Sequence, residues 1–134
     1  MKTNSPAFKY ICIFLCLILV FVSYSINRKR NQIKELKNLS LQNIEISNIP
    51  DGTYTGYANT SFLKVKLELI VQNGTLQDVK ILMNEGSVGQ NVASITQAMV
   101  KENKIIVSPI PDEEIASVVF MAAATNALSS QNQK

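Results

Sequence analysis

Three consecutive acidic residues, Asp112, Glu113 and Glu114, form the densest cluster of side chains that could take part in chemistry. They lie in "SPIPDEEIASVVF", residues 108–120, directly before an apolar run. Carboxylates at a helix start satisfy unpaired amide N–H groups and favour the positive end of the helix dipole, whereas grouped carboxylates can also bind a cation. We interpret these three residues as helix-capping acids rather than as a metal site.

Several classes of chemistry are excluded by what the chain lacks. The 134 residues include no histidine, so catalysis and metal binding that depend on histidine are ruled out. Cys12 and Cys16 both lie in an apolar stretch, so we expect no disulfide and no zinc site. The sequence offers no catalytic residue, which argues against an enzymatic activity of its own.

The apolar stretch is "YICIFLCLILVFVSYSI", Tyr10 to Ile26, which carries no charge over 17 residues. Such a run fits a short membrane span and also the core of a signal peptide. Cleavage after Ser25 is conceivable because Ser23 and Ser25 are small. The basic run "NRKR" directly behind the apolar stretch favours an uncleaved, single-pass anchor in the lipid bilayer.

The net charge differs in sign between the membrane-flanking N-terminal part and the rest of the chain. Residues 1–37 hold seven basic side chains against Glu35, a net charge of +6, whereas residues 38–134 hold six basic and nine acidic groups, a net charge of −3. The pI of 8.9 is therefore due to the basic residues that flank the apolar stretch. Nothing in the remaining part indicates a nucleic-acid partner.

Three parts follow from these patterns: an N-terminal tail and transmembrane anchor (1–26), a basic helical stalk (27–41) and a folded domain (42–134). In the domain, "LKVKLELIV" alternates apolar and polar residues, which predicts a strand with one buried face. Asn73-Gly74 then predicts a hairpin. We expect a three-residue loop, Asn73 to Thr75, with Gly74 or Thr75 in a bulge. The expected pairs are Leu69–Val79, Leu67–Ile81 and Val65–Met83.

Further elements complete an α+β prediction. "DGTYTGYA", residues 51–58, predicts a preceding strand, and "KIIVSPI" predicts a short strand over 104–108. A helix is expected with Val92, Ile95 and Met99 on its apolar face. The last helix begins with the three acids and is expected to turn these residues to the core: Ile115, Val118, Val119, Ala122 and Leu128. We expect an antiparallel, hairpin-rich sheet packed by two helices, behind one N-terminal transmembrane helix.

These segments resemble the FMN-binding domain family. The resemblance rests on "IPDGTYTGYA", on "VKLELIVQNGTLQDVKIL" and on the helix, short strand and final helix that follow, and it covers 42–130. Family members are membrane-linked flavoproteins of bacterial electron-transfer complexes. The resemblance therefore implies extracytoplasmic flavin electron transfer, with FMN as cofactor and a membrane redox complex as partner.

The family's most specific motif, Ser-Gly-Ala-Thr, is not present in this chain. Its threonine can carry FMN through a phosphoester bond, and the ungapped match places the four residues on Pro111, Asp112, Glu113 and Glu114. A shifted register, over 119–122, fits the helix worse and also lacks a threonine. A phosphate beside the acids would meet repulsion of about 1 kcal/mol or more per charge pair. We expect no covalent FMN at Glu114.

Non-covalent FMN stays open, as does the alternative of a cofactor-free, membrane-tethered interaction domain. The resemblance implies that Tyr54 and Tyr57 could stack on the isoalloxazine ring, although tyrosines in strands commonly serve in packing. It also implies that Gly86 and Gly89, in the segment 84–89, could lie near the flavin.

The sequence gives two conflicting indications of topology. The family's domains lie outside the cytoplasm, which requires a cytoplasmic N-terminus. Five basic residues follow the span, against Lys2, Lys9 and the α-amino group before it, and the positive-inside rule alone would keep the domain in the cytoplasm. We expect an extracytoplasmic domain, following the resemblance.

Overall fold

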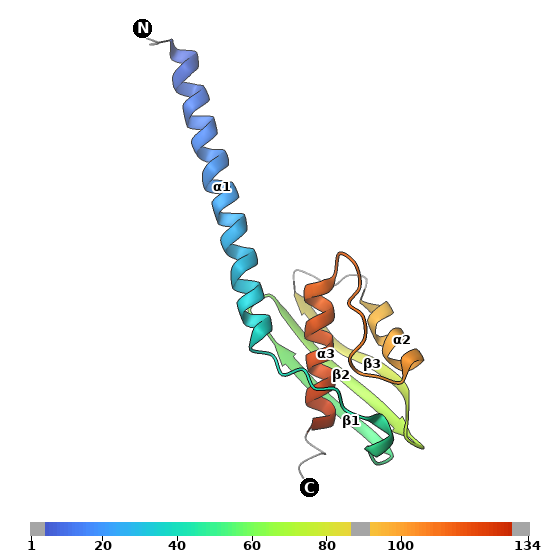
Figure 1. Ribbon diagram of the computed structural model, residues 1–134. Helices are drawn as coiled ribbons and strands as arrows, with labels where there is room; N and C mark the ends of the chain where they lie inside the picture. The colour runs from blue at the N-terminus through green and yellow to red at the C-terminus, as the bar shows by residue number, and fades with distance from the viewer. Residues whose placement is uncertain (1–4, 87–91, 130–134) are drawn as a thin grey trace. The chain divides into compact units, whose positions relative to one another are not determined.

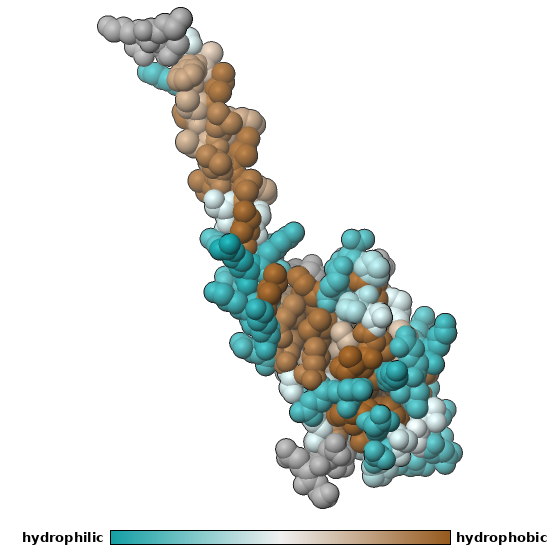
Figure 2. All heavy atoms as spheres, in the orientation of Figure 1, coloured by the Kyte–Doolittle hydropathy of each residue, from teal (hydrophilic) through white to brown (hydrophobic). Residues whose placement is uncertain are grey.

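The computed structural model describes residues 5–86 and 92–129 of the chain, in two units, Met1–Ile33 and Lys34–Lys134. Helix α1 (Pro6–Lys37) has its residues up to Ile33 in the first unit and Lys34–Lys37 in the second. Its apolar side chains are exposed along the first unit (Figure 2). Among the described residues, α1 is the one helix long and apolar enough to cross a membrane, with a mean hydropathy of 2.3 over an 18-residue stretch. A signal sequence near an N-terminus has the same properties.

The second unit is an α+β domain, as predicted. Its sheet has three antiparallel strands in the order β1 (Gly52–Asn59), β2 (Leu63–Gln72) and β3 (Thr75–Gly86). Helices α2 (Ala93–Glu102) and α3 (Glu114–Ser129) follow the sheet in the chain and lie on one of its faces (Figure 1). A single 3-10 turn, η1 (Ile46–Asn48), precedes β1.

Buried and exposed side chains alternate along β2, as its sequence predicts. Leu63, Val65, Leu67, Leu69 and Val71 are buried beneath the helices, with exposed fractions of at most 1%. The intervening Lys64, Lys66 and Glu68 belong to the opposite, outer face, where Glu68 forms an ion pair of 3.5 Å with Lys80. The sheet therefore has one face in the core and one polar face of mixed charge.

The β2–β3 connection corrects the predicted loop. Gln72 pairs with Thr75, so the loop has two residues, Asn73 and Gly74, rather than three. Both have positive φ, 53° and 67°, the backbone conformation of the tight hairpin turn that Asn-Gly favours. The extra residue lies in a bulge further on, between the pairs Ile70–Asp78 and Val71–Leu76.

That later bulge restores the predicted register for part of the hairpin. Leu69 pairs with Val79 and Leu67 with Ile81, as predicted. The expected pair Val65–Met83 is wrong, because a second irregularity shifts the register at Leu82: Met83 lies opposite Lys66, and Val65 lies opposite Asn84. Each bulge adds one residue to β3 without a partner on β2.

Helix α3 is the centre of the core. Eleven of its sixteen residues are buried, including the predicted Val119, Ala122 and Leu128, whereas Ile115 and Val118 are half-buried. One side packs on β1 and β2. The segment before β1 covers another side: Gln42 N lies 3.5 Å from Thr125 Oγ1, and Ile44, Ile46 and Ile49 are buried (Figure 1). A helix enclosed in this way is apolar nearly all round.

The predicted strand at 104–108 does not form. The chain there is irregular, although Ile105 and Val107 are buried. Asn103, which follows the last residue of α2, has a left-handed backbone with φ 51° and reverses the chain. The segment then returns to the start of α3. As predicted, Ile95 and Met99 of α2 and the preceding Val92 face the core.

Candidate functional site

The start of α3 is the position where the resemblance places the flavin attachment motif. Only Glu114 lies in the first helical turn; Asp112 and Glu113 precede the helix, so the expectation of three acids within the first turn is wrong. Asp112 has a left-handed backbone, φ 68°, which bends the chain into the helix. Its N–H lies 3.3 Å from Glu114 Oε1.

A serine within α3 fixes this bend. Ser117 Oγ accepts a hydrogen bond from Ile110 N at 3.0 Å and donates one to the Glu113 carbonyl at 2.9 Å. Ser117 is fully buried, so both contacts are shielded from water. We did not predict this role from the sequence. The available signal was a serine in an apolar helix, four residues after an acid, where a back-bonding hydroxyl is common.

The structure gives no support for a metal site at the bend. In the described ranges 5–86 and 92–129, no group of three or more acidic or cysteine side chains is placed to hold a metal ion. The negative charge of the three carboxylates at the bend lies at the end of α3 where the dipole would favour an anion.

The two tyrosines that could contact a flavin ring lie on opposite faces of β1. Tyr54 shares the inner face with Gly56 and Ala58, is half-buried, and its hydroxyl donates to the Pro50 carbonyl at 2.6 Å. Tyr57 belongs to the outer face and is 45% exposed. One planar ring therefore cannot stack on both.

Tyr57 is also far from the start of α3. Its carbonyl accepts a hydrogen bond from Asn126 Nδ2 at 2.8 Å, near the C-terminal end of the helix. Asn126 follows Glu114 by twelve residues, or roughly 18 Å along a helix. Glu114 and Tyr57 therefore belong to opposite ends of α3.

Gly86 has a packing reason for its small size. A Cβ at this position would lie 2.9 Å from Leu63 Cα and closer still to the Phe62 carbonyl. Gly86 is the last residue of β3 and pairs with Leu63 at the start of β2. Gly89 lies outside the described residues. The predicted set is therefore not brought together among the residues that the structure describes.

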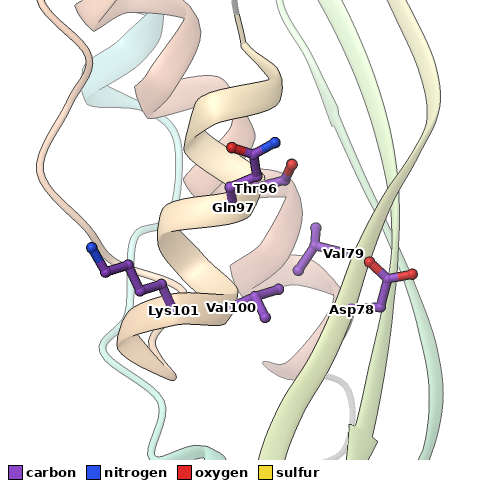
Figure 3. A pocket seen from close by; sticks show the side chains of 6 residues that line it. All are labelled: Asp78, Val79, Thr96, Gln97, Val100 and Lys101. Carbon is purple, nitrogen blue, oxygen red and sulfur yellow. The ribbon is translucent and has the colours of Figure 1, made fainter.

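Hollows lined by described residues lie on the surface of the second unit, and three of them bear on the candidate site. One, of about 290 Å³, opens between β3 and α2, where Val79 and Val100 point toward each other and Thr96 lies above them (Figure 3). A second, of about 240 Å³, is lined by residues 43–47 with Asn103 and Lys104. The third, of about 380 Å³, lies beside Gly52 and Ile70. Tyr54, Tyr57, Gly86 and Glu114 line none of these three.

Comparison with known proteins gives no match: no family model, no curated protein and no solved structure is similar to this chain.

Proposed function

We propose that this chain is a membrane-anchored protein whose folded domain has the scaffold of an FMN-binding domain and works as an interaction domain without flavin. The backbone of Asp112 is the observation that carries the proposal. The resemblance places the family's glycine at Asp112, and Asp112 has φ 68°, a left-handed conformation that glycine adopts without strain and that aspartate and asparagine adopt more often than other residues do. The backbone before α3 is therefore compatible with a glycine at this position, as the proposed scaffold requires.

The side chains of the same bend disfavour flavin phosphate. Glu114 stands where the motif has its threonine, and a carboxylate cannot form the phosphoester bond of a hydroxyl. Asp112 and Glu113 add negative charge beside it, and each pair with a phosphate charge costs about 1 kcal/mol or more near a surface. Because Tyr54 and Tyr57 lie on opposite faces of β1, they cannot together form a stacking surface for the isoalloxazine ring.

A second candidate is a flavin protein that holds FMN non-covalently and exchanges electrons with a membrane redox complex. The left-handed backbone at Asp112 supports this candidate equally, because a glycine at this position could adopt the same conformation. Under this candidate the phosphate would have to be bound away from the carboxylates. The two candidates share the anchor and the scaffold, and they differ in whether FMN is present.

Absorption of the purified full chain in detergent separates the two. We expect no flavin bands near 370 and 450 nm, no flavin released on denaturation, and no quenching of FMN fluorescence on titration. A yellow protein that releases unmodified FMN would replace the interaction domain by the second candidate. Flavin that stays attached after denaturation would contradict both candidates and the placement of the motif.

A gain-of-function variant tests the scaffold independently of the parent's behaviour. Pro111→Ser with Asp112→Gly, Glu113→Ala and Glu114→Thr restores the motif and removes three carboxylates from the start of α3. With FAD and a flavin transferase present, we expect the variant to gain the mass of one FMN and the parent to gain none. Glu114→Thr alone is the matched control, since it supplies the hydroxyl but keeps two acids. A folded quadruple variant without flavin would contradict the proposed scaffold.

A further inference from the structure

The last ten residues of α1 carry a dense group of positive charges. Five basic side chains lie between positions 28 and 37, directly after the apolar stretch, and all five are exposed. This part of the helix is polar at its surface (Figure 2). We call the five residues the basic segment; they are Arg28, Lys29, Arg30, Lys34 and Lys37.

No acidic side chain neutralises the basic segment. Glu35 is the one acid among residues 1–37, and its two carboxylate oxygens accept hydrogen bonds from Ser61, at 2.6 and 2.7 Å. None of the five basic residues lies three or four positions from Glu35, the spacing at which side chains meet on a helix surface. Within residues 5–86 and 92–129, none of the five forms an ion pair. Their charge is therefore available to an external anion.

Part of the basic segment is also repulsive within the helix. Arg30 and Lys34 are four residues apart, and Lys34 and Lys37 are three apart, so these like charges are neighbours on one helix face and destabilise it. The helix dipole favours Lys34 and Lys37 in the last turn of α1, whereas Arg30 lies before that turn. An anionic partner at this face would remove the repulsion.

Depth along α1 decides which basic residues can reach lipid headgroups. A helix rises about 1.5 Å per residue, so Arg28–Arg30 lie about 3–6 Å past residue 26, Lys34 about 12 Å and Lys37 about 16 Å. The headgroup layer is about 5–8 Å thick on each side of a bilayer. Helical side chains tilt toward the N-terminus, which here is the direction of the bilayer, and long basic side chains extend to the interface. Lys34 therefore reaches back to the headgroups, whereas Lys37 lies beyond them.

We propose that the basic segment binds anionic phospholipid headgroups of the membrane in which α1 is anchored, through Arg28, Lys29 and Arg30, with Lys34 reaching back. Arginine side chains form charge-assisted hydrogen bonds with phosphate oxygens. A zwitterionic lipid offers the same phosphate but carries a compensating cation, so net negative lipids are preferred. The proposal rests on α1 as an uncleaved anchor, and it assigns a ligand to this helix with or without flavin in the domain.

Native mass spectrometry of the full chain in neutral detergent tests the lipid preference. The chain is mixed with equal amounts of phosphatidylglycerol and phosphatidylcholine at low salt. Each basic residue close to an anionic surface contributes about fivefold to binding, so we expect about tenfold or greater preference for phosphatidylglycerol. Arg28→Gln with Lys29→Gln and Arg30→Gln should abolish the preference. The matched control is Lys64→Gln with Lys66→Gln and Lys101→Gln, which removes three exposed charges from the domain and should leave the preference unchanged.

A pair of single substitutions tests the depth. Arg30 and Lys37 are seven residues apart and share one face of α1, so they differ mainly in their distance from the apolar stretch. Arg30→Gln should weaken phosphatidylglycerol binding about fivefold, and Lys37→Gln less than twofold. Arg30→Lys keeps the charge and should retain most of the binding. Equal losses in Arg30→Gln and Lys37→Gln would contradict the headgroup placement.

Three further outcomes would overturn the proposal. Equal retention of the two lipids would exclude a preference for anionic headgroups, and a preference that survives in the triple variant of α1 would place it elsewhere in the chain. Displacement of the lipid by an equal concentration of inorganic phosphate would indicate a soluble anion as the ligand. A purified chain whose mass lacks the first 25 residues would instead contradict the anchor itself, and the intact mass distinguishes this failure from a loss of lipid preference.

Discussion

At the scale of single residues, Gly56 controls the contact between the sheet and α3. A Cβ at Gly56 would lie 2.5 Å from Ala127 N and closer to the Ala123 carbonyl, and both atoms belong to the backbone of α3. Neither can move without displacing the helix. Gly56→Ala should therefore lower the free energy of unfolding by about 3 kcal/mol or more, the upper range for an overfilled core. Pulse proteolysis of the full chain in urea measures this change.

Gly52→Ala is the matched control on the same strand. The nearest atom to its Cβ would be the hydroxyl oxygen of Tyr54, at 3.3 Å, at the end of a side chain that can shift by a few tenths of an ångström. We expect a change of less than about 1 kcal/mol. Equal losses for the two substitutions would show that strand β1 tolerates alanine poorly for reasons other than contact with α3.

Glu35 provides a pH-dependent contact within the second unit. Its Oε1 accepts a hydrogen bond from Ser61 Oγ at 2.6 Å, and its Oε2 accepts one from Ser61 N at 2.7 Å. Both bonds favour the ionised form and lower the pKa of Glu35 below its ordinary value of 4.5, the hydroxyl bond contributing more. The stabilisation is therefore present above pH 4.5 and is lost as the pH falls through the lowered pKa.

Carboxyl-carbon NMR of the full chain in detergent measures the pKa of Glu35 directly. We expect a midpoint below 4.5 in the parent. In Ser61→Ala the backbone donor remains but the hydroxyl is gone, so the pKa should rise part of the way to its ordinary value. An unchanged midpoint in Ser61→Ala would show that the hydroxyl does not set the pKa.

At the scale of elements, the β2–β3 hairpin depends on two left-handed residues. Gly74→Ala places a Cβ on a residue with φ 67° and 3.2 Å from Ser47 Cα. Left-handed backbone costs an alanine about 1–2 kcal/mol, so unfolding free energy should fall by at least that amount. Thr75→Ala, on the neighbouring exposed residue, should change it by less than about 0.5 kcal/mol. Thermal unfolding of the two variants and the parent chain measures both changes.

The same hairpin shows what its sequence could and could not predict. Alternation in β2 and the Asn73-Gly74 turn predicted the strands and the pair Leu69–Val79. They did not distinguish a three-residue loop from a two-residue loop followed by a bulge, because both give the same register beyond the bulge. The irregularity at Leu82 has no local signal in the sequence, and the pair Val65–Met83 was therefore wrong.

The two helices of the domain also differ in how well their sequences predicted them. Periodicity predicted α2 and its apolar face, since half of that helix remains in water. For α3, periodicity predicted too few buried residues. A helix that is covered on several sides has no polar face that would show its orientation. The segment 104–108 is rich in β-branched residues, but its chain packs against the core without a neighbouring strand, and propensity alone does not supply that partner.

At the scale of the whole molecule, the candidate site illustrates a limit of motif transfer. Asp112, where the resemblance places the motif's glycine, has a left-handed backbone, but the assignment of the motif to this position stays a prediction. The pairing of Tyr54 with Tyr57 on one flavin was less sound, and the sequence already contained the objection: residues three apart on a strand point to opposite faces. The distance from Tyr57 to Glu114 depends on how α3 packs on β1, which only the folded chain shows.

Membrane topology is the last prediction, and the charges around the span make it a strict test of the resemblance. We propose that the C-terminal domain lies outside the cytoplasm, although Arg28, Lys29 and Arg30 directly follow the apolar stretch of α1. The positive-inside rule counts such residues near a span and favours their retention on the cytoplasmic side. A long folded segment can nevertheless be exported despite flanking charge, as the same rule allows for large domains.

Protease added to intact, wall-stripped cells should therefore degrade the domain while a cytoplasmic marker survives. Arg28→Gln with Lys29→Gln and Arg30→Gln serves as the charge control: if export already dominates, the digestion of the domain should not change. Protection of the parent domain in intact cells, with digestion after lysis, would place it in the cytoplasm. Digestion that appears only in the neutralised variant would show that the basic flank, rather than the fold behind it, decides the orientation of this chain.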